Sequence, residues 1–363
     1  MKFNCSICGG NISEKVIEYN NFGLNKYDGL FDNLSLCFCI DCGFGSIDTK
    51  INPDLIWNFY KFQYRAKNSA FHINFDSKND IHETFVDFAH KTTQQITLIN
   101  DHCDFKKGEN FLDIGPGPGG SFYIAEKLLY NPNLFGIEIT KGAREFYNQF
   151  PLSKITIFDS IEDFISTQKK AKVILMSHSL EHYQVEELPK LFQDIKKALD
   201  PSGVLIIEVP NVDLRVHEKV RGTDTPHFLF FSQNSICALL EKYGFQILFN
   251  STCDDFYESE YDIKNQDKTF KFKLKKSLRP IFNKLPMIIQ IQFRKLKMLK
   301  YYFMSINKSS LSSDIQQEIV STYTKKKHKV TIRKIDDNLV YGGNRKCIRI
   351  IAKLSKNKVT KVT

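Results

Sequence analysis

The stretch "NFLDIGPGPGGSFYIAEKLL", residues 110–129, decides the fold of this chain. A strand with the apolar residues Phe111, Leu112 and Ile114 leads into a run of glycines and prolines from Gly115 to Gly120. A helix-forming segment follows from Ser121. Glycines at such a turn let the backbone approach a ligand closely and keep the strand–helix connection tight. A second predicted strand, at 133–140, carries Glu138, 23 residues beyond Gly115. An acid at this spacing is placed to bind ribose hydroxyls, so a βαβ unit with a ligand site is predicted.

Strands and helices continue to alternate beyond this unit. Further strands are predicted within 154–164, with Asp159 at the strand tip, and at 171–182, 204–211 and 245–249, with helices at 188–199 and 232–244 between them. This alternation predicts an α/β fold with a Rossmann-like, doubly wound parallel sheet. Ligands bind such sheets at the carboxyl ends of the strands. The groups expected at these ends are Gly115–Gly119, Glu138, Asp159 and His182.

Between residues 105 and 250 the sequence resembles the class I S-adenosylmethionine-dependent methyltransferases. The stretches that carry the resemblance are "LDIGPGPGGS", "FGIEI", "SLEHY", "LDPSGVLIIEVPN" and "PHFLFFSQNSICALLEKYGF". A last segment, "RKCIRIIAKL" at 345–354, is similar to the family's closing antiparallel strand. One departure is Lys172, where the family usually has an aspartate at the start of the fourth strand.

The resemblance implies a cofactor, S-adenosylmethionine, and a set of residues that hold it. Gly115, Gly117 and Gly119 would approach the methionine part, Glu138 the ribose and Asp159 the adenine end. Leu180 would line the floor near the methyl group, and Asp113 belongs to the same motif as the glycines. These seven residues form the predicted cofactor site.

Histidines are the candidate catalytic groups, because an unperturbed pKa of about 6.5 suits proton removal at neutral pH. His182 is expected at the end of the fourth strand, and His227 comes from a loop that often folds over the active site in this family. His178, Asn211 and Tyr64 are candidate substrate contacts, and Glu181 is expected to orient a loop or the cofactor. The alternative is that each histidine caps backbone or packs beside the cofactor, and that the tyrosine-rich segment 57–65 is simply packed.

Two Cys-x-x-Cys-Gly motifs near the N-terminus predict a metal site. They are "CSICGG" at 5–10 and "CIDCGF" at 39–44. Zinc favours four soft ligands in a tetrahedron, and each motif supplies two thiolates at a tight turn. The complete set of Cys5, Cys8, Cys39 and Cys42 leaves no open position, so the predicted zinc is structural. Cys37 is an alternative fourth ligand, but only one residue separates it from Cys39, which is the wrong spacing for a Cys-x-x-Cys turn.

Charge is concentrated in one segment. The net charge of the 363-residue chain is +10, and residues 264–308 hold thirteen Lys and Arg against one Asp. This mixture of basic and apolar residues is compatible with contact to an anionic membrane or with binding of nucleotide-sugar or RNA phosphates. It is also compatible with a solvated helical hairpin that covers the sheet or forms a dimer. The start of the sequence does not resemble a secretory signal, so a cytoplasmic protein is expected, with peripheral contact to the inner face of the membrane as one reading.

Together these features predict five segments: a zinc ribbon at 1–50, a helical connector at 51–105, a methyltransferase core at 106–257, a basic insert at 258–340 and a closing strand at 341–356. Two Cys-x-x-Cys-Gly motifs before such a core resemble bacterial sugar methyltransferases, which implies a sugar or nucleotide-sugar acceptor in polysaccharide or glycoconjugate biosynthesis. Zinc ribbons with basic segments also occur in RNA methyltransferases, which makes RNA the alternative acceptor. A non-catalytic, cofactor-binding module is the third reading.

Overall fold

The computed structural model describes residues 4–14, 17–20, 34–64, 92, 95–96, 98–99, 101–140, 143–144, 147, 155–216, 220–221, 227–253 and 347–355. The chain divides into two units, the first formed by Met1–Asp255 with Lys334–Thr363 and the second by Phe256–Arg333. All described residues belong to the first unit, so the basic segment 264–308 lies outside them. Within the described ranges, no helix has the length and apolar character needed to cross a membrane.

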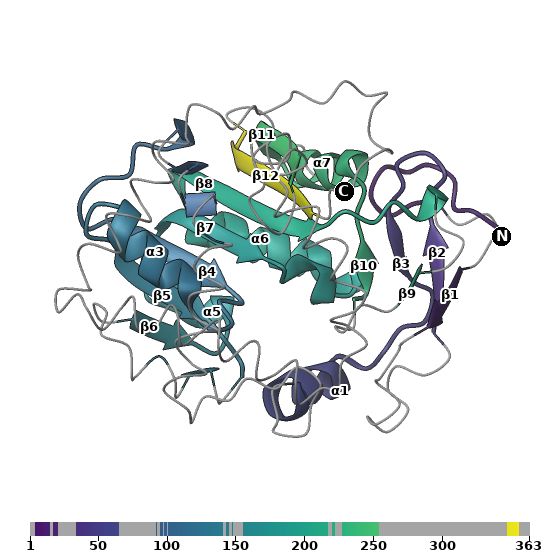
Figure 1. Cartoon of the computed structure of the whole chain (residues 1–363), viewed down its shortest axis with the longest axis horizontal. Coiled ribbons are helices and arrows are strands. Elements are labelled where there is room, and N and C mark those ends of the chain that lie inside the picture. The colour runs from purple at the N-terminus through teal and green to yellow at the C-terminus, as the bar shows by residue number, and fades with distance from the viewer. Residues whose placement is uncertain are drawn as a thin grey trace, which may run out of the picture. The chain divides into compact units, whose positions relative to one another are not determined.

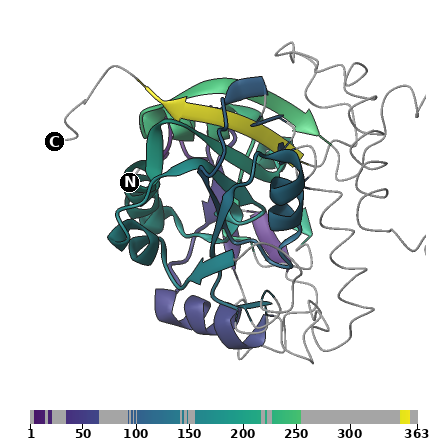
Figure 2. The same cartoon turned by 90° about the vertical axis from the view of Figure 1, so that its left-hand side faces the viewer.

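The larger sheet has the strand order β11-β12-β8-β7-β4-β5-β6. Strands β8, β7, β4, β5 and β6 pair in parallel, whereas β12 is antiparallel to both β8 and β11. Figure 1 shows the parallel strands side by side, and Figure 2 shows β12 in yellow beside β11 in green. The strands are β4 (Asn110–Ile114), β5 (Asn133–Ile137), β6 (Ile155–Phe158), β7 (Ala171–Ser177), β8 (Leu199–Pro210), β11 (Phe245–Cys253) and β12 (Cys347–Leu354).

Helices cover both faces of this sheet, as the alternation of buried side chains along the strands shows. Leu112 and Ile174 pack in one core with α5 (Ile161–Ser166), α6 (Leu188–Ala198) and α7 (Gln233–Lys242). Their neighbours Phe111 and Val173 pack in a second core with α3 (Gly120–Leu128). Successive side chains of a strand point to opposite faces, so the two cores lie on opposite sides of the sheet. The predicted Rossmann-like α/β fold with a mainly parallel sheet is confirmed.

The fifth strand of the core begins earlier than predicted. We expected "DPSG" at 200–203 to end the preceding helix and the strand to begin at residue 204, but β8 begins at Leu199. Ala171 pairs with Leu199 and Val173 with Val204, so residues 200–203 form a bulge opposite Lys172. The turn-forming residues are accommodated inside the strand, and Lys172 Nζ donates a hydrogen bond to Ser202 Oγ at 2.8 Å.

A smaller sheet joins the N-terminal segment to the core, in the order β10-β3-β2-β1-β9. Its three inner strands come from the N-terminal segment: β1 (Ile17–Asn20), β2 (Ser35–Phe38) and β3 (Gly45–Ile47). The two outer strands, β9 (Val220–Arg221) and β10 (Leu229–Phe230), come from the stretch between β8 and α7. Leu36 and Phe38 share a buried cluster with Phe228 and Phe230. The segment that carries His227 is therefore held by the N-terminal strands.

Candidate active site

The glycine turn lies between β4 and α3 and has the conformation that the sequence predicted for it. Gly115, Gly117 and Gly119 all have positive φ, at 83°, 53° and 80°. A Cβ on Gly119 would lie 2.7 Å from the ring of Tyr147, whose hydroxyl donates a hydrogen bond to the carbonyl of Gly117. A side chain at Gly119 is therefore disfavoured both by backbone conformation and by space, and one at Gly117 by backbone conformation alone.

Asp113 lies directly before the turn and joins it to the next helix. Its carboxylate is buried and accepts a hydrogen bond from the hydroxyl of Ser121 in the first turn of α3. Burial raises the pKa of Asp113 to about 7, although the Ser121 hydrogen bond opposes this shift. In this structure the predicted cofactor residue Asp113 thus connects strand and helix beneath the turn.

The other predicted acids follow the next two strands. Glu138, after β5, accepts hydrogen bonds from the Gly117 N–H at 3.1 Å and the Thr140 N–H at 2.8 Å. Asp159, after β6, is exposed and forms an ion pair with Arg144. Because β4, β5 and β6 are parallel neighbours, the glycine turn, Glu138 and Asp159 lie along one edge of the sheet.

Three histidines surround one buried carboxylate at the end of β7. Glu181 lies in the 3₁₀ helix η2 (Leu180–His182), and 1% of the residue is exposed. Its Oε1 is 3.4 Å from His178 Nδ1 and 4.0 Å from His227 Nε2. The His182 and His227 rings are 5.0 Å apart, centroid to centroid. The structure therefore brings together the three predicted histidines, and Glu181 stands at their centre.

Burial and charge have opposite effects on these groups. Burial lowers the pKa of His227 to about 3, with a further contribution from His182. Burial would raise the pKa of Glu181, but the close approach and charge of His178, with the charges of His182 and His227, outweigh it and hold this pKa below its usual value. Burial would lower the pKa of His178, yet Cys347, Glu181 and Glu208 together raise it well above the usual range.

Tyr60 contacts this cluster from a distant part of the sequence. Its hydroxyl lies 2.8 Å from Nδ1 of His182. We expected a regular tyrosine-rich helix at 57–65, but α1 (Pro53–Asn58) continues as a π-helix, η1 (Phe59–Gln63). The Tyr64 ring lies 5.1 Å from that of Tyr60 and 6.5 Å from that of His182. Tyr64 is thus beside the histidines, and the contact of Tyr60 was missed because no local pattern reports it.

Two further contacts fix how the segment after β7 lies against α1 and the glycine turn. The side chain of Gln184 exchanges two hydrogen bonds of 2.9 Å with the backbone of Ile51, which anchors the start of α1 beside η2. A Cβ on Gly115 would lie 2.9 Å from Cβ of Ser179, so the glycine turn lies against the segment that leads into the histidines. Leu180 is fully buried there, and Asn211 follows β8, bridged to Phe231.

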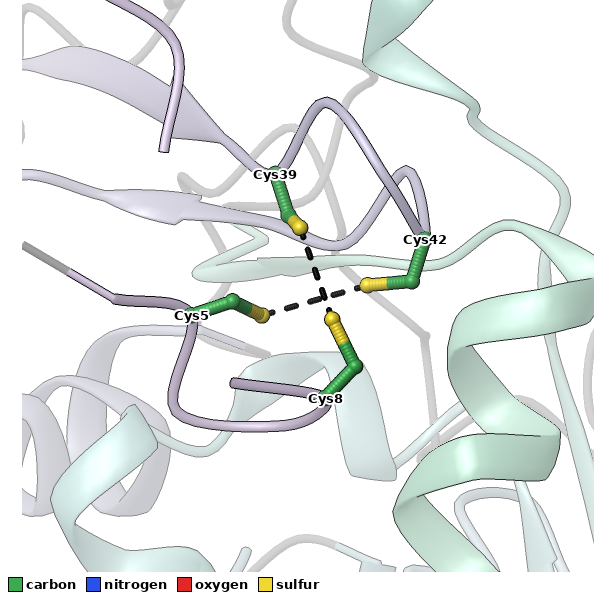
Figure 3. A group of neighbouring side chains, drawn as sticks. All are labelled: Cys5, Cys8, Cys39 and Cys42. Atoms are coloured by element: carbon green, nitrogen blue, oxygen red, sulfur yellow. Dashed lines mark hydrogen bonds between the residues drawn. The ribbon is translucent and has the colours of Figure 1, made fainter. Parts of the chain in front are cut away.

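The four predicted cysteines converge at one point in the N-terminal segment (Figure 3). The sulfur atoms of Cys5 and Cys42 are 3.8 Å apart, those of Cys8 and Cys39 are 3.6 Å apart, and all four lie within 4.8 Å of one another. Thiolates around tetrahedral zinc, at about 2.3 Å from the ion, are about 3.8 Å from each other. The set therefore fits zinc, and the sulfur of Cys37 contacts Ser46 instead.

Comparisons with known proteins identify the domain. Residues 86–249 match the family model described as "Methyltransferase domain". No curated protein matches the sequence. This sequence match, which covers the glycine turn, Glu138 and the histidines, shows that the chain is an S-adenosylmethionine-dependent methyltransferase.

Solved structures resemble the chain at low levels of similarity. The plantazolicin methyltransferase BpumL is 14% identical with a TM-score of 0.43, over 82% of this chain and 94% of BpumL. A SAM dependent methyltransferase from Archaeoglobus fulgidus is 17% identical with a TM-score of 0.40, over 75% and 97%. The cyclopropane synthase MmaA2 from Mycobacterium tuberculosis is 14% identical with a TM-score of 0.39, over 71% and 82%. Similarity at these levels transfers no substrate to this chain.

Proposed function

We propose that this S-adenosylmethionine-dependent methyltransferase transfers a methyl group to a sugar or nucleotide-sugar acceptor. The observation that carries the proposal is the contact of the Tyr60 hydroxyl with His182. The ring of His182 lies 5.0 Å from that of His227, and both are at the edge of the sheet where the glycine turn lies. Phenol and imidazole groups bind hydroxyls, and an imidazole can take the proton that a hydroxyl acceptor loses.

The cofactor half of the site would be formed by the ends of β4, β5 and β6. S-adenosylmethionine supplies an electrophilic methyl group when it is bound. The glycines at 115, 117 and 119, with their positive φ, leave room for the cofactor to approach the backbone closely. Glu138 would bind the ribose hydroxyls, and Asp159 would contact the adenine end. The hydrogen bond from Gly117 N–H to Glu138 ties the turn to this acid.

The acceptor half would be formed by the ends of β7 and β8 and by η1. Sugars present hydroxyls and apolar C–H faces, which suit a site that combines polar side chains with aromatic rings. Tyr64 would pack against the acceptor, and His178 and Asn211 would bind its hydroxyls. His182 and His227 would contact the reacting oxygen, or the carbon next to a carbonyl, and assist the loss of its proton.

The four cysteines would hold a structural zinc that fixes the acceptor half. Four thiolates complete a tetrahedral site and leave no position for a substrate. Strand β3, which begins three residues after Cys42, pairs with β10, which begins two residues after His227. Zinc would therefore stabilise the segment that carries His227, which gives the N-terminal motifs a role next to the site of chemistry.

The basic segment 264–308 adds a sequence-based proposal that lies outside the described residues. Its mixture of basic and apolar residues would let it contact an anionic membrane surface and so bring the enzyme to a lipid-linked glycan. Co-sedimentation with anionic liposomes, for the wild type and for a variant that lacks 264–308, tests this. Equal pelleting of the two proteins would contradict it.

The proposed function is tested in two steps. Calorimetric titration with S-adenosylhomocysteine should first show micromolar binding. An absence of binding would contradict the proposed methyltransferase activity. Transfer of radiolabelled methyl groups should then be measured for a panel of nucleotide-sugars, free sugars and total cellular RNA. Labelling of nucleotide-sugars supports the proposal, whereas labelling of RNA alone would overturn it in favour of an RNA methyltransferase.

A further inference from the structure

The cluster around Glu181 has an unusual electrostatic composition. Neither Oε1 nor Oε2 of Glu181 has a hydrogen-bond partner among the described residues, although both atoms are fully buried. His178 is the nearest basic group, with Nδ1 3.4 Å from Oε1, but its other ring nitrogen lies 3.4 Å from Glu208. A buried carboxylate is costly unless a cation or several donors compensate it, and Oε2 has neither in the described part of the chain.

The ligand atoms around Glu181 are those of a metal site. One atom each from Glu181, His182 and His227 lies within 4.8 Å of the other two. Two imidazoles and one carboxylate are a common ligand set for a divalent transition-metal ion, and three protein ligands leave at least one position open. From these observations we infer that Glu181, His182 and His227 bind a divalent transition-metal ion such as Zn²⁺, separate from the four-cysteine site.

The ligand atoms lie within 4.8 Å of one another, so each pair would close by at most about 1.4 Å around such an ion. Ligand atoms about 2.0–2.1 Å from a tetrahedral ion lie about 3.3–3.4 Å apart. His227 Nε2 is 4.0 Å from Glu181 Oε1, so this pair would close by about 0.7 Å. Rotation of side chains is sufficient for that movement.

Tyr60 provides the outer partner that such a ligand usually has. A metal-bound histidine is typically oriented by a hydrogen bond at its other ring nitrogen. The Tyr60 hydroxyl, 2.8 Å from His182 Nδ1, occupies that place and would leave Nε2 to face the ion. The contact that sequence reasoning missed thus acquires a specific role in fixing the ring and its tautomer.

A neighbouring group of possible metal ligands contains a carboxylate whose charge is already balanced by an arginine. His178, Glu208 and Cys347 also offer three ligand atoms within 4.8 Å of one another. There, however, Arg349 contacts Glu208 at 2.6 Å and 2.5 Å, so the carboxylate already has its cation. A second positive ion beside Arg349 would be repelled, and for this reason we place the metal at Glu181.

The inference rests on the proposed function only for the role of the ion, not for its binding. The open position would take an acceptor hydroxyl and lower the pKa of that hydroxyl, as divalent ions do for bound water. His182 and His227 would then act through the ion that they hold: the acceptor proton would pass to water, and the acceptor oxygen would take the methyl group as its bond to the cofactor sulfur breaks.

The first experiment counts metal ions per chain. Protein is equilibrated with Zn²⁺, dialysed against metal-free buffer and measured by inductively coupled plasma mass spectrometry. We expect two zinc ions per chain in the wild type and one in Glu181→Gln and in His227→Gln. His102→Gln, which changes a histidine packed against Phe249 away from the cluster, should retain two. One ion in the wild type, or two in both cluster variants, would overturn the inference.

Replacement by Co²⁺ assigns each ion to its site. Thiolate ligands give intense charge-transfer absorption that nitrogen and oxygen ligands lack. Glu181→Gln should keep this absorption and lose the weaker bands of the second ion, and Cys8→Ser should do the reverse. Titration with S-adenosylhomocysteine confirms that each variant is folded. If the protein binds both ions but methylates no sugar, the proposed acceptor is wrong and the proposed metal site is still supported.

Discussion

The hydroxyl of Tyr60 lies 2.8 Å from Nδ1 of His182, although 122 positions separate the two residues in the sequence. This contact joins the helical segment after the N-terminal strands to the end of β7. It fixes the orientation of an imidazole ring that also lies against the rings of Tyr64 and His227.

Tyr60→Phe removes the hydrogen bond and keeps the ring. Because the His182 ring is then free to rotate and to change tautomer, we expect kcat to fall about tenfold, with the affinity for S-adenosylhomocysteine unchanged. Steady-state kinetics and calorimetry measure the two quantities. Tyr130→Phe changes an exposed tyrosine, 65% accessible, and should alter neither. Equal kcat values for Tyr60→Phe and the wild type would show that the hydrogen bond has no catalytic role.

His182→Ala removes the imidazole itself. Whether it contacts the acceptor directly or holds a metal ion, its loss should reduce kcat by about 100-fold or more. Cofactor affinity should persist, since the glycine turn and Glu138 follow other strands. His102→Ala is the matched control and should remain fully active. A loss smaller than about tenfold, with cofactor binding intact, would exclude His182 from the chemistry.

Much of the fold could be predicted because its signals are local. The mostly apolar segment 111–114 and the glycine turn after it identify β4 and α3 without tertiary information. The alternation of strands and helices then indicates a parallel sheet. The start of β8 was misplaced because "DPSG" favours a turn in isolation. Pairing with β7 overrides that preference and accommodates the four residues in a bulge opposite Lys172.

The site was only partly predictable for the same reason. His182, Glu138 and Asp159 could be assigned to one edge because parallel strands end on the same side. Their partners depend on contacts between distant segments. The proximity of Glu181 to His178 and His227, and of Tyr60 to His182, follows from how η1, η2 and the stretch before β10 pack, which no spacing in the sequence reports.

Gly119→Ala should weaken cofactor binding. Alanine is strained at the φ of 80° found there, and its Cβ would lie 2.7 Å from the Tyr147 ring, so the turn must move. We expect the dissociation constant for S-adenosylhomocysteine to rise about 5- to 30-fold, as about 1–2 kcal/mol of strain implies. Gly108→Ala has a similar φ of 77° with open space around it, and should lower stability while leaving cofactor affinity unchanged. Unaltered binding in Gly119→Ala would show that the turn does not touch the cofactor.

Removal of a cysteine ligand should affect catalysis more than cofactor binding. Cys39→Ser would release the zinc, and the small sheet that joins β3 to β10 would lose its support. Because His227 lies just before β10, we expect kcat to fall at least about tenfold while S-adenosylhomocysteine still binds. Cys37→Ser removes a thiol that contacts Ser46 and should retain both zinc and activity. If Cys39→Ser and Cys37→Ser lose the same share of kcat, the loss does not arise from release of the zinc.

The pH dependence of stability should carry a contribution from Asp113. Burial raises its pKa to about 7 in the folded state, against 3.8 when exposed, so the folded protein holds a proton that the unfolded chain releases. The stabilisation is complete below pH 3.8 and is lost as the pH rises through 7, with a size of about 4 kcal/mol at most. Asp113→Asn cannot ionise and should flatten the fall between pH 4.5 and 8.

Urea unfolding of the wild type and Asp113→Asn across this pH range measures the difference between the two free-energy curves. Asp104→Asn changes an exposed carboxylate, 84% accessible, and should run parallel to the wild type. The same histidines are present in all three proteins, so the difference between the curves isolates Asp113. If the curve of Asp113→Asn also runs parallel to that of the wild type, Asp113 is ionised throughout, and the Ser121 hydrogen bond outweighs the cost of burying its charge.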